Sequence, residues 1–240
     1  MADVKVIMTG CPVRTNFGVM AIPTIVLIDG EKKTLYDVGG YHVRHQLFEG
    51  LAKHNLTTAN IDRVILSHLH WDHALFMEPF AHAEVIVSKK DHAAADDDKT
   101  RDSGTPPFMT RLLDNYKLTM VNGGEVLEDG VRLIEVPGHT AGGLVVECRN
   151  EKGLHIIAGD AIGHVCNLIL GQHDRGWYNQ AMADEGMKML ANLGGTIYPA
   201  HDRPFVYQNG QVTYREPYEI TIKCRFGLHG EFTDVKIIAP

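Results

Sequence analysis

The stretch SHLHWDH, residues 67–73, places three histidines and one aspartate within seven residues. His68 and His70 stand two positions apart, so both side chains can point the same way from an extended chain. Asp72 and His73 follow as the chain turns. Imidazole nitrogens combined with a carboxylate suit zinc, manganese or iron better than calcium or magnesium. Four candidate ligands are too many for one metal that keeps an open coordination position, so their density predicts two adjacent metals.

A two-metal site needs further donors, and three candidates follow apolar stretches elsewhere in the chain. His139 lies in EVPGHTAGG after Pro137-Gly138, Asp160 ends HIIAGD, and His201 ends TIYPAH. A polar side chain at the end of a buried strand can project into a cleft at the sheet edge. These three residues are therefore predicted to complete the site.

Four features follow one another along the chain: a strand leading into HxHxDH, then PGHT, then GD, then a histidine after a hydrophobic strand. This ordered pattern resembles that of the metallo-β-lactamase superfamily. The resemblance runs from Asp37 to His201. Asp37 begins an Asp-Val-Gly that is similar to the family's early Asp-x-Gly. It implies an α+β fold, a four-layer αββα sandwich in which two mixed sheets lie face to face with helices outside. It also implies that residues 1–240 form one domain.

The resemblance further implies a role for each ligand. The first metal would be held by His68, His70 and His139, and the second by Asp72, His73 and His201, with Asp160 bridging the two. Asp37 would orient a ligand without contacting a metal. The expected cofactors are two divalent metal ions, zinc first, with manganese or iron as alternatives.

Such a site predicts hydrolysis. Two adjacent cations lower the pKa of bound water from near 16 towards about 7 and hold a hydroxide that attacks a carbonyl or phosphorus. Asp72 would orient this nucleophile and take up its proton. The chain contains no GxSxG, and a metal-activated water requires no serine or cysteine nucleophile.

The layout is most similar to the N-acyl homoserine lactonases of the superfamily, so lactone or ester hydrolysis is the preferred prediction. Those enzymes typically carry a tyrosine shortly after the bridging aspartate, to help the leaving group depart. Here Asp160 is followed by Ala161-Ile162-Gly163-His164. Either His164, Tyr178 or Tyr41 supplies this function, or the substrate differs. The other histidines, His173 among them, are expected to be structural or solvated.

Two alternatives stay open. A glyoxalase II-like thioesterase would share the motifs, but usually adds a helical C-terminal region, whereas residues 211–240 have the pattern of strands and turns. An iron persulfide dioxygenase would share the motifs and hold a single iron. A tRNA-processing phosphodiesterase would need a basic exosite that this sequence does not offer, and β-lactam hydrolases are usually exported.

The elements that must position the ligands follow from apolar patterning. Strands are predicted at 5–8, 24–29, 34–37, 61–67, 84–88 and 194–202, with hairpins over 125–138 and 143–160. Helices are predicted at 41–54, 111–116 and 178–193. The strand–turn–strand segments that end at Asp37 and Asp160 resemble each other, which suggests two similar halves.

Residues 91–110 change in character, from acidic to rich in glycine and proline. This segment is predicted to be a surface excursion, with Phe108 at its apolar tip as a candidate substrate contact. Whether it is a catalytic lid or a plain solvated loop is left open by the sequence.

Composition limits the partners. The 240 residues carry 23 basic and 30 acidic side chains, a net charge of −7, and no basic run. An acidic balance argues against a nucleic-acid or anionic-membrane surface, so the expected partner is a small-molecule substrate, with a homodimer as a candidate assembly. The start, MADVKVIMTG, lacks the pattern of a signal peptide, and the four scattered cysteines resemble reduced thiols, which together predict a cytoplasmic protein.

Overall fold

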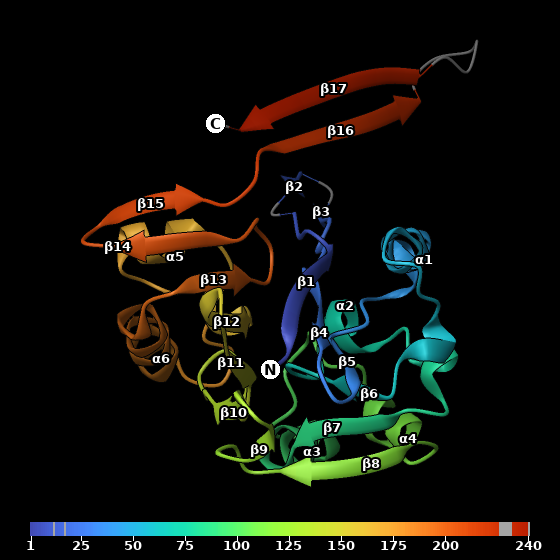
Figure 1. Cartoon of the computed structure of the whole chain (residues 1–240). Helices are drawn as coiled ribbons and strands as arrows, with labels where there is room; N and C mark the ends of the chain where they lie inside the picture. The colour runs from blue at the N-terminus through green and yellow to red at the C-terminus, as the bar shows by residue number, and fades with distance from the viewer. Residues whose placement is uncertain (12, 17, 226–231, 240) are drawn as a thin grey trace.

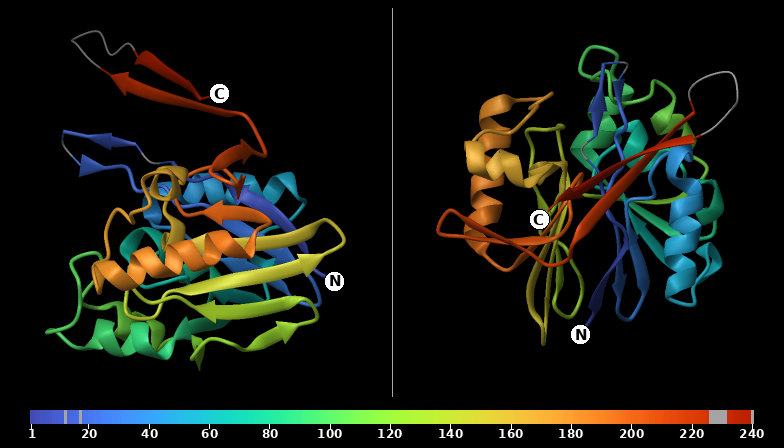
Figure 2. Two further views of the ribbon diagram at one scale, coloured as in Figure 1. Left: turned by 90° about the vertical axis from the view of Figure 1, so that its left-hand side faces the viewer. Right: turned by 90° about the horizontal axis from the view of Figure 1, so that it is seen from above.

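Two β-sheets lie face to face in this protein, and helices cover the outer surface of each sheet (Figure 1, Figure 2). The structure is a computed structural model that describes residues 1–11, 13–16, 18–225 and 232–239. The earlier part of the chain forms one sheet and the later part forms the other. The predicted α+β class and αββα sandwich are confirmed.

The first sheet is mixed. In spatial order its strands are β1 (Asp3–Met8), β4 (Ile25–Asp29), β5 (Lys33–Tyr36), β6 (Arg63–Ile65), β7 (Glu84–Ser88) and β8 (Lys117–Val121). The pairs β1–β4 and β4–β5 are antiparallel, whereas β5, β6, β7 and β8 run parallel to one another. The parallel strands bring their carboxyl ends to one edge, where HxHxDH begins after β6.

The second sheet is mostly antiparallel. In spatial order its strands are β15 (Gln211–Tyr214), β14 (Phe205–Gln208), β13 (Thr196–Pro199), β12 (Gly153–Gly159), β11 (Leu144–Asn150), β10 (Val131–Glu135) and β9 (Val126–Glu128). The pair β12–β13 is parallel, and the other pairs are antiparallel. Because β12 and β13 run parallel, Asp160 and His201 emerge at the same edge.

The helices lie on the outer faces of the two sheets. Those of the first half are α1 (Arg44–Lys53), α2 (Trp71–Ala74), α3 (Lys89–Asp96) and α4 (Met109–Leu113), and those of the second half are α5 (Val165–Leu170) and α6 (Gln180–Leu193). Single 3₁₀ turns occur at Tyr41–Val43, Thr58–Asn60, Glu78–Phe80 and Asp160–Ile162. Gly50 of α1 lies so close to β1 that a Cβ there would be 2.1 Å from the Ile7 carbonyl oxygen. The missing side chain therefore lets α1 pack directly on the sheet.

Alternation along β4 shows how the layers are held together. Ile25 and Leu27 pack outwards with Leu47 and Leu51 of α1, whereas Val26 packs inwards with residues of the second sheet. The second sheet buries its own outer face against Met187 and Leu190 of α6, among other residues. Side chains of a strand alternate between the two faces, so one strand contributes to two cores. The three cores are the three interfaces of a four-layer sandwich.

Two hairpins extend beyond this sandwich. They are β2 (Arg14–Thr15) with β3 (Gly18–Val19), and β16 (Tyr218–Arg225) with β17 (Phe232–Ala239). The second hairpin projects well away from both sheets (Figure 2). The prediction of strands and turns over 211–240 agrees with the strands β15, β16 and β17, and residues 226–231 of that segment lie outside the described residues. No helix within the described ranges is long and apolar enough to cross a membrane.

The expectation of a loop from residue 91 is wrong at its start, because α3 continues to Asp96. The Ser88 hydroxyl accepts hydrogen bonds from the backbone amides of Lys90 and Asp91, which caps the helix, and three alanines then favour its continuation. The irregular stretch is 97–108. The helix predicted at 111–116 is also displaced, since α4 begins at Met109.

Candidate metal centre

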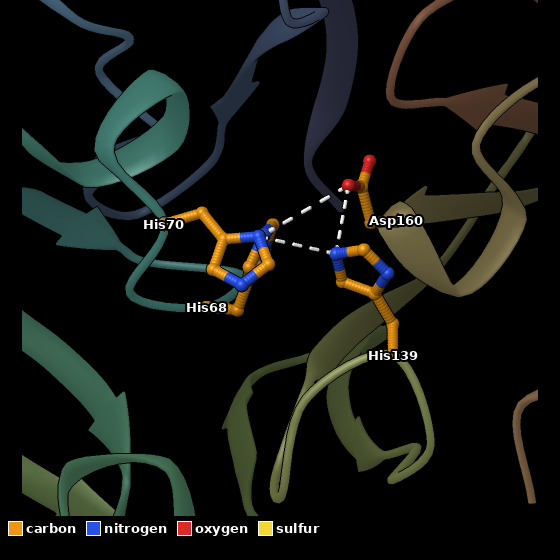
Figure 3. A group of neighbouring side chains, drawn as sticks. All are labelled: His68, His70, His139 and Asp160. Carbon is orange, nitrogen blue, oxygen red and sulfur yellow. Dashed lines mark hydrogen bonds and ion pairs between the residues drawn. The ribbon is translucent and has the colours of Figure 1, made fainter. Parts of the chain in front are cut away.

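Seven side chains gather between the two sheets in two groups. One contains His68, His70, His139 and Asp160, and the other contains Asp72, His73 and His201. Within each group the candidate ligand atoms all lie within 4.8 Å of one another. Figure 3 shows His68 and His70 facing His139 and Asp160 from opposite sides of the site. The structure thus brings together all seven residues that the sequence singled out, in the two expected sets.

The carboxylate of Asp160 lies between the groups. Its Oδ2 atom is 3.0 Å from His139 Nε2 and 3.9 Å from His68 Nε2. Its Oδ1 atom is 3.2 Å from His201 Nε2 and 3.7 Å from His73 Nε2. One oxygen therefore faces each group.

The ligands of the first sheet come from a tight turn after β6. Leu69 is buried in the outer core, so the flanking His68 and His70 point away from that core and towards the second sheet. The short helix α2 then turns Asp72 and His73 inwards. The C-terminal end of α2 is held in place because the backbone amides of Val38 and Gly39 both donate to the His73 carbonyl.

The ligands of the second sheet depend on two glycines. Gly138 precedes His139 with φ of +138°, and a Cβ there would lie 2.2 Å from the backbone nitrogen of Ala183 in α6. Gly159 precedes Asp160 with φ of +51°, and a Cβ there would lie 2.7 Å from the Tyr36 hydroxyl. Only glycine combines these conformations with such close packing.

Backbone carbonyls fix the protonation of His139 and His201. The Nδ1 atom of His139 is 2.8 Å from the Arg175 carbonyl oxygen, and that of His201 is 2.9 Å from the Ile22 carbonyl oxygen. A carbonyl only accepts, so each Nδ1 carries the proton. In the neutral ring each Nε2 is then the lone-pair nitrogen and is directed into the site, the form that binds a metal.

Asp37 does the same for two histidines of the other sheet. Its Oδ2 atom accepts from His73 Nδ1 at 2.7 Å and from the Ser67 hydroxyl at 2.8 Å. Because that hydroxyl donates to Asp37, it can accept from His68 Nδ1, which lies 2.9 Å away. Both imidazoles therefore present Nε2 to the centre. Asp37 is fully buried with φ of +63°, an uncommon conformation for a non-glycine residue.

His70 is supported by a residue that the sequence did not suggest. Its Nε2 atom lies 3.0 Å from Asp102 Oδ1, which leaves Nδ1 facing His139 Nε2 at 3.2 Å. Asp102 is held by the backbone amides of Gly104 and Thr105, at 2.8 and 3.0 Å. Asp102 follows no strand and belongs to no motif, so no pattern in the sequence indicated it.

The donor set fits two metal ions. The Nε2 atoms of His68 and His73 and the Oδ1 atom of Asp160 are buried and lack a hydrogen-bond partner among the described residues. Buried polar atoms are ordinarily hydrogen-bonded, so unpaired ring nitrogens and an unpaired carboxylate oxygen at one site indicate that it binds a ligand. Nitrogen and carboxylate donors without sulfur suit zinc, manganese or iron. The two groups are consistent with a dinuclear site.

Burial and neighbouring charges shift the pKa values of the buried imidazoles in different directions. Burial, together with His73 and His70, holds the pKa of His68 well below its ordinary value. For His73, burial acts in the opposite direction to the carboxylates of Asp72, Asp37 and Asp160, which raise its pKa to about 10. Burial would raise the pKa of Asp160, but His201, His139 and His73 hold it well below the ordinary range. Asp160 is therefore a carboxylate at neutral pH.

A cavity of about 210 Å³ opens onto this centre. His164 and Asp72 are among its lining residues. Tyr41, Tyr178 and Phe108, the other substrate-contacting residues suggested by the sequence, do not line it. Tyr41 packs edge-on against Phe76, with ring centroids 5.2 Å apart, and Tyr178 lines a separate small recess beside Asp102. Phe108 is exposed at the start of α4.

The segment 173–177, HDRGW, is the main part of the site that the sequence did not indicate. His173, Asp174, Arg175 and Trp177 all line the cavity. His173 Nε2 donates to the Asp160 carbonyl oxygen at 2.5 Å, and the Trp177 ring lies edge-on to His70 at 6.2 Å. The segment is irregular and lies between α5 and α6, where neither strand nor helix periodicity draws attention to it.

The site can be set beside known proteins. The family model described as the metallo-beta-lactamase superfamily matches residues 18–201. The metallo-beta-lactamase domain-containing protein 1 of Xenopus laevis is 26% identical over 203 residues, which cover 80% of this chain and 76% of that protein.

Solved structures share the fold at lower identity. A putative metallo-beta-lactamase from Thermotoga maritima superimposes with a TM-score of 0.66 at 19% identity, over 86% of this chain and 99% of the other. AidC, a dizinc quorum-quenching lactonase in complex with a product, superimposes with a TM-score of 0.63 at 20% identity, over 80% of this chain and 78% of the other.

Proposed function

The chain belongs to the metallo-beta-lactamase superfamily and is a metal-dependent hydrolase of that fold, and we propose that it uses two metal ions to hydrolyse a lactone or ester. The observation that supports this proposal most strongly is the arrangement of the five imidazoles. Each has one ring nitrogen occupied by an outer partner and the other directed into the site.

In this proposal His68, His70 and His139 would hold one ion and Asp72, His73 and His201 would hold the other, with Asp160 as a ligand that faces both groups. The bound pair supplies a Lewis acid and a water that ionises near neutral pH. Zinc is the preferred metal, in keeping with the donor set and with the dizinc lactonase of the same fold. Asp37 fixes the rings of His73 and, through Ser67, of His68.

Asp72 is placed to serve the nucleophile. It lines the cavity, and its Oδ2 atom is 3.4 Å from His73 Nε2 and 3.7 Å from His201 Nε2. In this position the Asp72 carboxylate would orient the attacking water and take up its proton.

His164 is the candidate proton donor for the leaving group. Two histidines line the cavity without belonging to the seven candidate ligands, His164 and His173. Both ring nitrogens of His173 are engaged, one with the Asp160 carbonyl and one with the Arg175 amide, so it cannot deliver a proton. His164 Nε2 lies 2.8 Å from the Asp174 carboxylate, which accepts a hydrogen bond from the ring and holds it at the cavity wall.

The alternatives are less well supported. β14 and β15 follow His201 and are succeeded by the β16–β17 hairpin, where a glyoxalase II-like thioesterase would place its helical region. Neither a thioesterase nor a mononuclear iron dioxygenase gains a specific observation from the site.

The test is a substrate panel. The zinc-loaded protein is assayed with lactones, esters, thioesters and phosphodiesters, with His164→Ala measured beside the wild type. We expect lactone or ester hydrolysis, and a loss of kcat in His164→Ala that is smaller for substrates whose leaving group needs no proton, such as nitrophenyl esters. Hydrolysis of none of the lactones and esters would contradict the proposal.

A further inference from the structure

The segment 173–177 is tied to the metal centre at several points. His173 donates to the Asp160 carbonyl and accepts from the Arg175 backbone amide at 3.1 Å. The Arg175 carbonyl in turn accepts from His139 Nδ1 at 2.8 Å. The backbone of Arg175 is therefore fixed directly behind a candidate metal ligand, and its side chain lines the cavity from that point.

The one carboxylate of this segment, Asp174, already has ion-pair and hydrogen-bond partners. Asp174 Oδ2 lies 2.8 Å from His164 Nε2 and 2.9 Å from Arg14 Nη2, and its Oδ1 accepts from Asn167 at 3.1 Å. Arg14 comes from the β2–β3 hairpin and also lines the cavity. With these partners Asp174 does not repel an anion entering the cavity.

Arg175 differs from Arg14 in having no carboxylate within ion-pair distance among the residues that the structure describes. Its guanidinium lies over the face of Trp177, 5.1 Å from the ring centroid. Stacking of this kind holds a guanidinium in place while its N–H groups stay available at the edge of the plane. An unpaired, stacked arginine on a cavity wall is suited to an oxyanion.

Apart from the metal centre and the polar side chains just named, the wall has apolar side chains. Val19, Ala21 and Trp71 line it. A ligand that fits the whole cavity therefore has an apolar body, one end at the metal ligands and another end at Arg175.

We propose that the substrate carries a carboxylate remote from its scissile bond, and that Arg175 binds this carboxylate. The inference rests on the proposed function for the identity of the reacting end. Arg175 is a specificity-determining residue, because its contact is with the far end of the substrate. It acts equally in substrate and product, so its loss raises KM more than it lowers kcat.

The experiment measures binding to the zinc-loaded protein by calorimetry. The probes are succinate, glutarate and adipate, each compared with the monocarboxylate of equal length, namely butyrate, pentanoate and hexanoate. The variants are Arg175→Gln and Arg175→Lys, and the matched control is Arg111→Gln, an exposed arginine on α4 outside the cavity. Side-chain changes at 175 leave its carbonyl, and so the His139 contact, in place.

We expect at least one dicarboxylate to bind about tenfold more tightly than its matched monocarboxylate, as for one charge-assisted contact at a partly exposed site. Arg175→Gln should abolish this preference, Arg175→Lys should keep part of it, and Arg111→Gln should leave it unchanged. The inference is overturned if wild type shows no preference, or if Arg175→Gln retains it in full.

Turnover of neutral lactones and esters separates this inference from the proposed function. Hydrolysis of neutral substrates without any dicarboxylate preference would overturn the inference alone. A preference that depends on Arg175, in a protein that hydrolyses nothing in the panel, would support the inference and contradict the proposed function.

Discussion

His73 is the residue on which protons and metals compete most directly. It is fully buried, and Asp72, Asp37 and Asp160 overcome the effect of burial and raise its pKa from 6.5 to about 10. Since the pKa is higher in the folded chain, the charged ring stabilises the metal-free fold fully below about pH 6.5. This contribution is lost as the pH rises through about 10.

Metal binding should therefore release protons. A ligating imidazole must be neutral, so His73 gives up its proton when an ion binds to the group of Asp72, His73 and His201. The apparent zinc affinity then rises by about tenfold per pH unit for each proton released. Calorimetric titration at pH 7 in two buffers of different ionisation enthalpy gives the number of protons. A value of zero would contradict the proposed role of His73.

Asp102 should control metal affinity without touching a metal. Asp102→Ala removes the carboxylate 3.0 Å from His70 Nε2, and the ring loses the partner that fixes its orientation. Partners of this kind are worth about 10–100-fold in metal affinity. Zinc affinity measured by competition with a chelator should fall by at least about tenfold.

The control for Asp102 lies in the same stretch. Asp98 has a largely exposed side chain, 86% accessible, and pairs with Arg101 and not with the metal site. Asp98→Ala should bind zinc as the wild type does. Equal affinities in the two variants would show that Asp102 does not position His70.

At the scale of elements, the strands that carry ligands could be predicted and their surroundings could not. Apolar runs ending in Asp37, Asp160 and His201 lie in buried strands or directly after them, so patterning located them. β8 and α5 have no clear alternation or long periodic face, and neither was predicted. The same reason explains which site residues could be predicted. The metal ligands belong to a motif, whereas Asp102 and Arg175 lie in irregular segments that come close to the centre only in the folded structure.

The turn before His139 should be intolerant of any side chain. Gly138→Ala introduces a Cβ 2.2 Å from the Ala183 backbone nitrogen, so α6 or the His139 loop must shift. Gly153→Ala is a matched control, since Gly153 also has positive φ, +116°, but a Cβ there meets nothing within 4 Å. Urea unfolding of the metal-free proteins should show Gly138→Ala less stable than Gly153→Ala by about 1–3 kcal/mol, as for overpacking. Equal stabilities would contradict the close packing.

At the scale of the whole molecule, the metal centre joins two halves and the last hairpin lies apart from it. Among the strands of the described residues, β16 and β17 pair only with each other, and they project beyond the sandwich (Figure 2). None of the described residues of the hairpin lines the cavity at the metal centre. The homodimer considered from the sequence stays a prediction, which sedimentation of the full chain would test.

A chain that ends at Pro217 should keep the site. It retains Glu216, whose carbonyl accepts a hydrogen bond from Arg203 beside the end of the second sheet. Zinc content and affinity should match those of the full chain. Loss of zinc on truncation would show that the hairpin supports the centre in a way that its position does not indicate.

The central claim, that seven side chains from two sheets hold two metal ions, is tested most directly by metal content. Protein produced with excess zinc and freed of loosely bound ions is analysed by mass spectrometry of the elements, beside Asp160→Ala and Lys188→Ala, the latter an α6 change away from the site. We predict two zinc ions per chain in wild type and Lys188→Ala, and a clear loss in Asp160→Ala, because Asp160 faces both groups. A single iron per chain in the wild type, or two zinc ions retained in Asp160→Ala, would contradict the account.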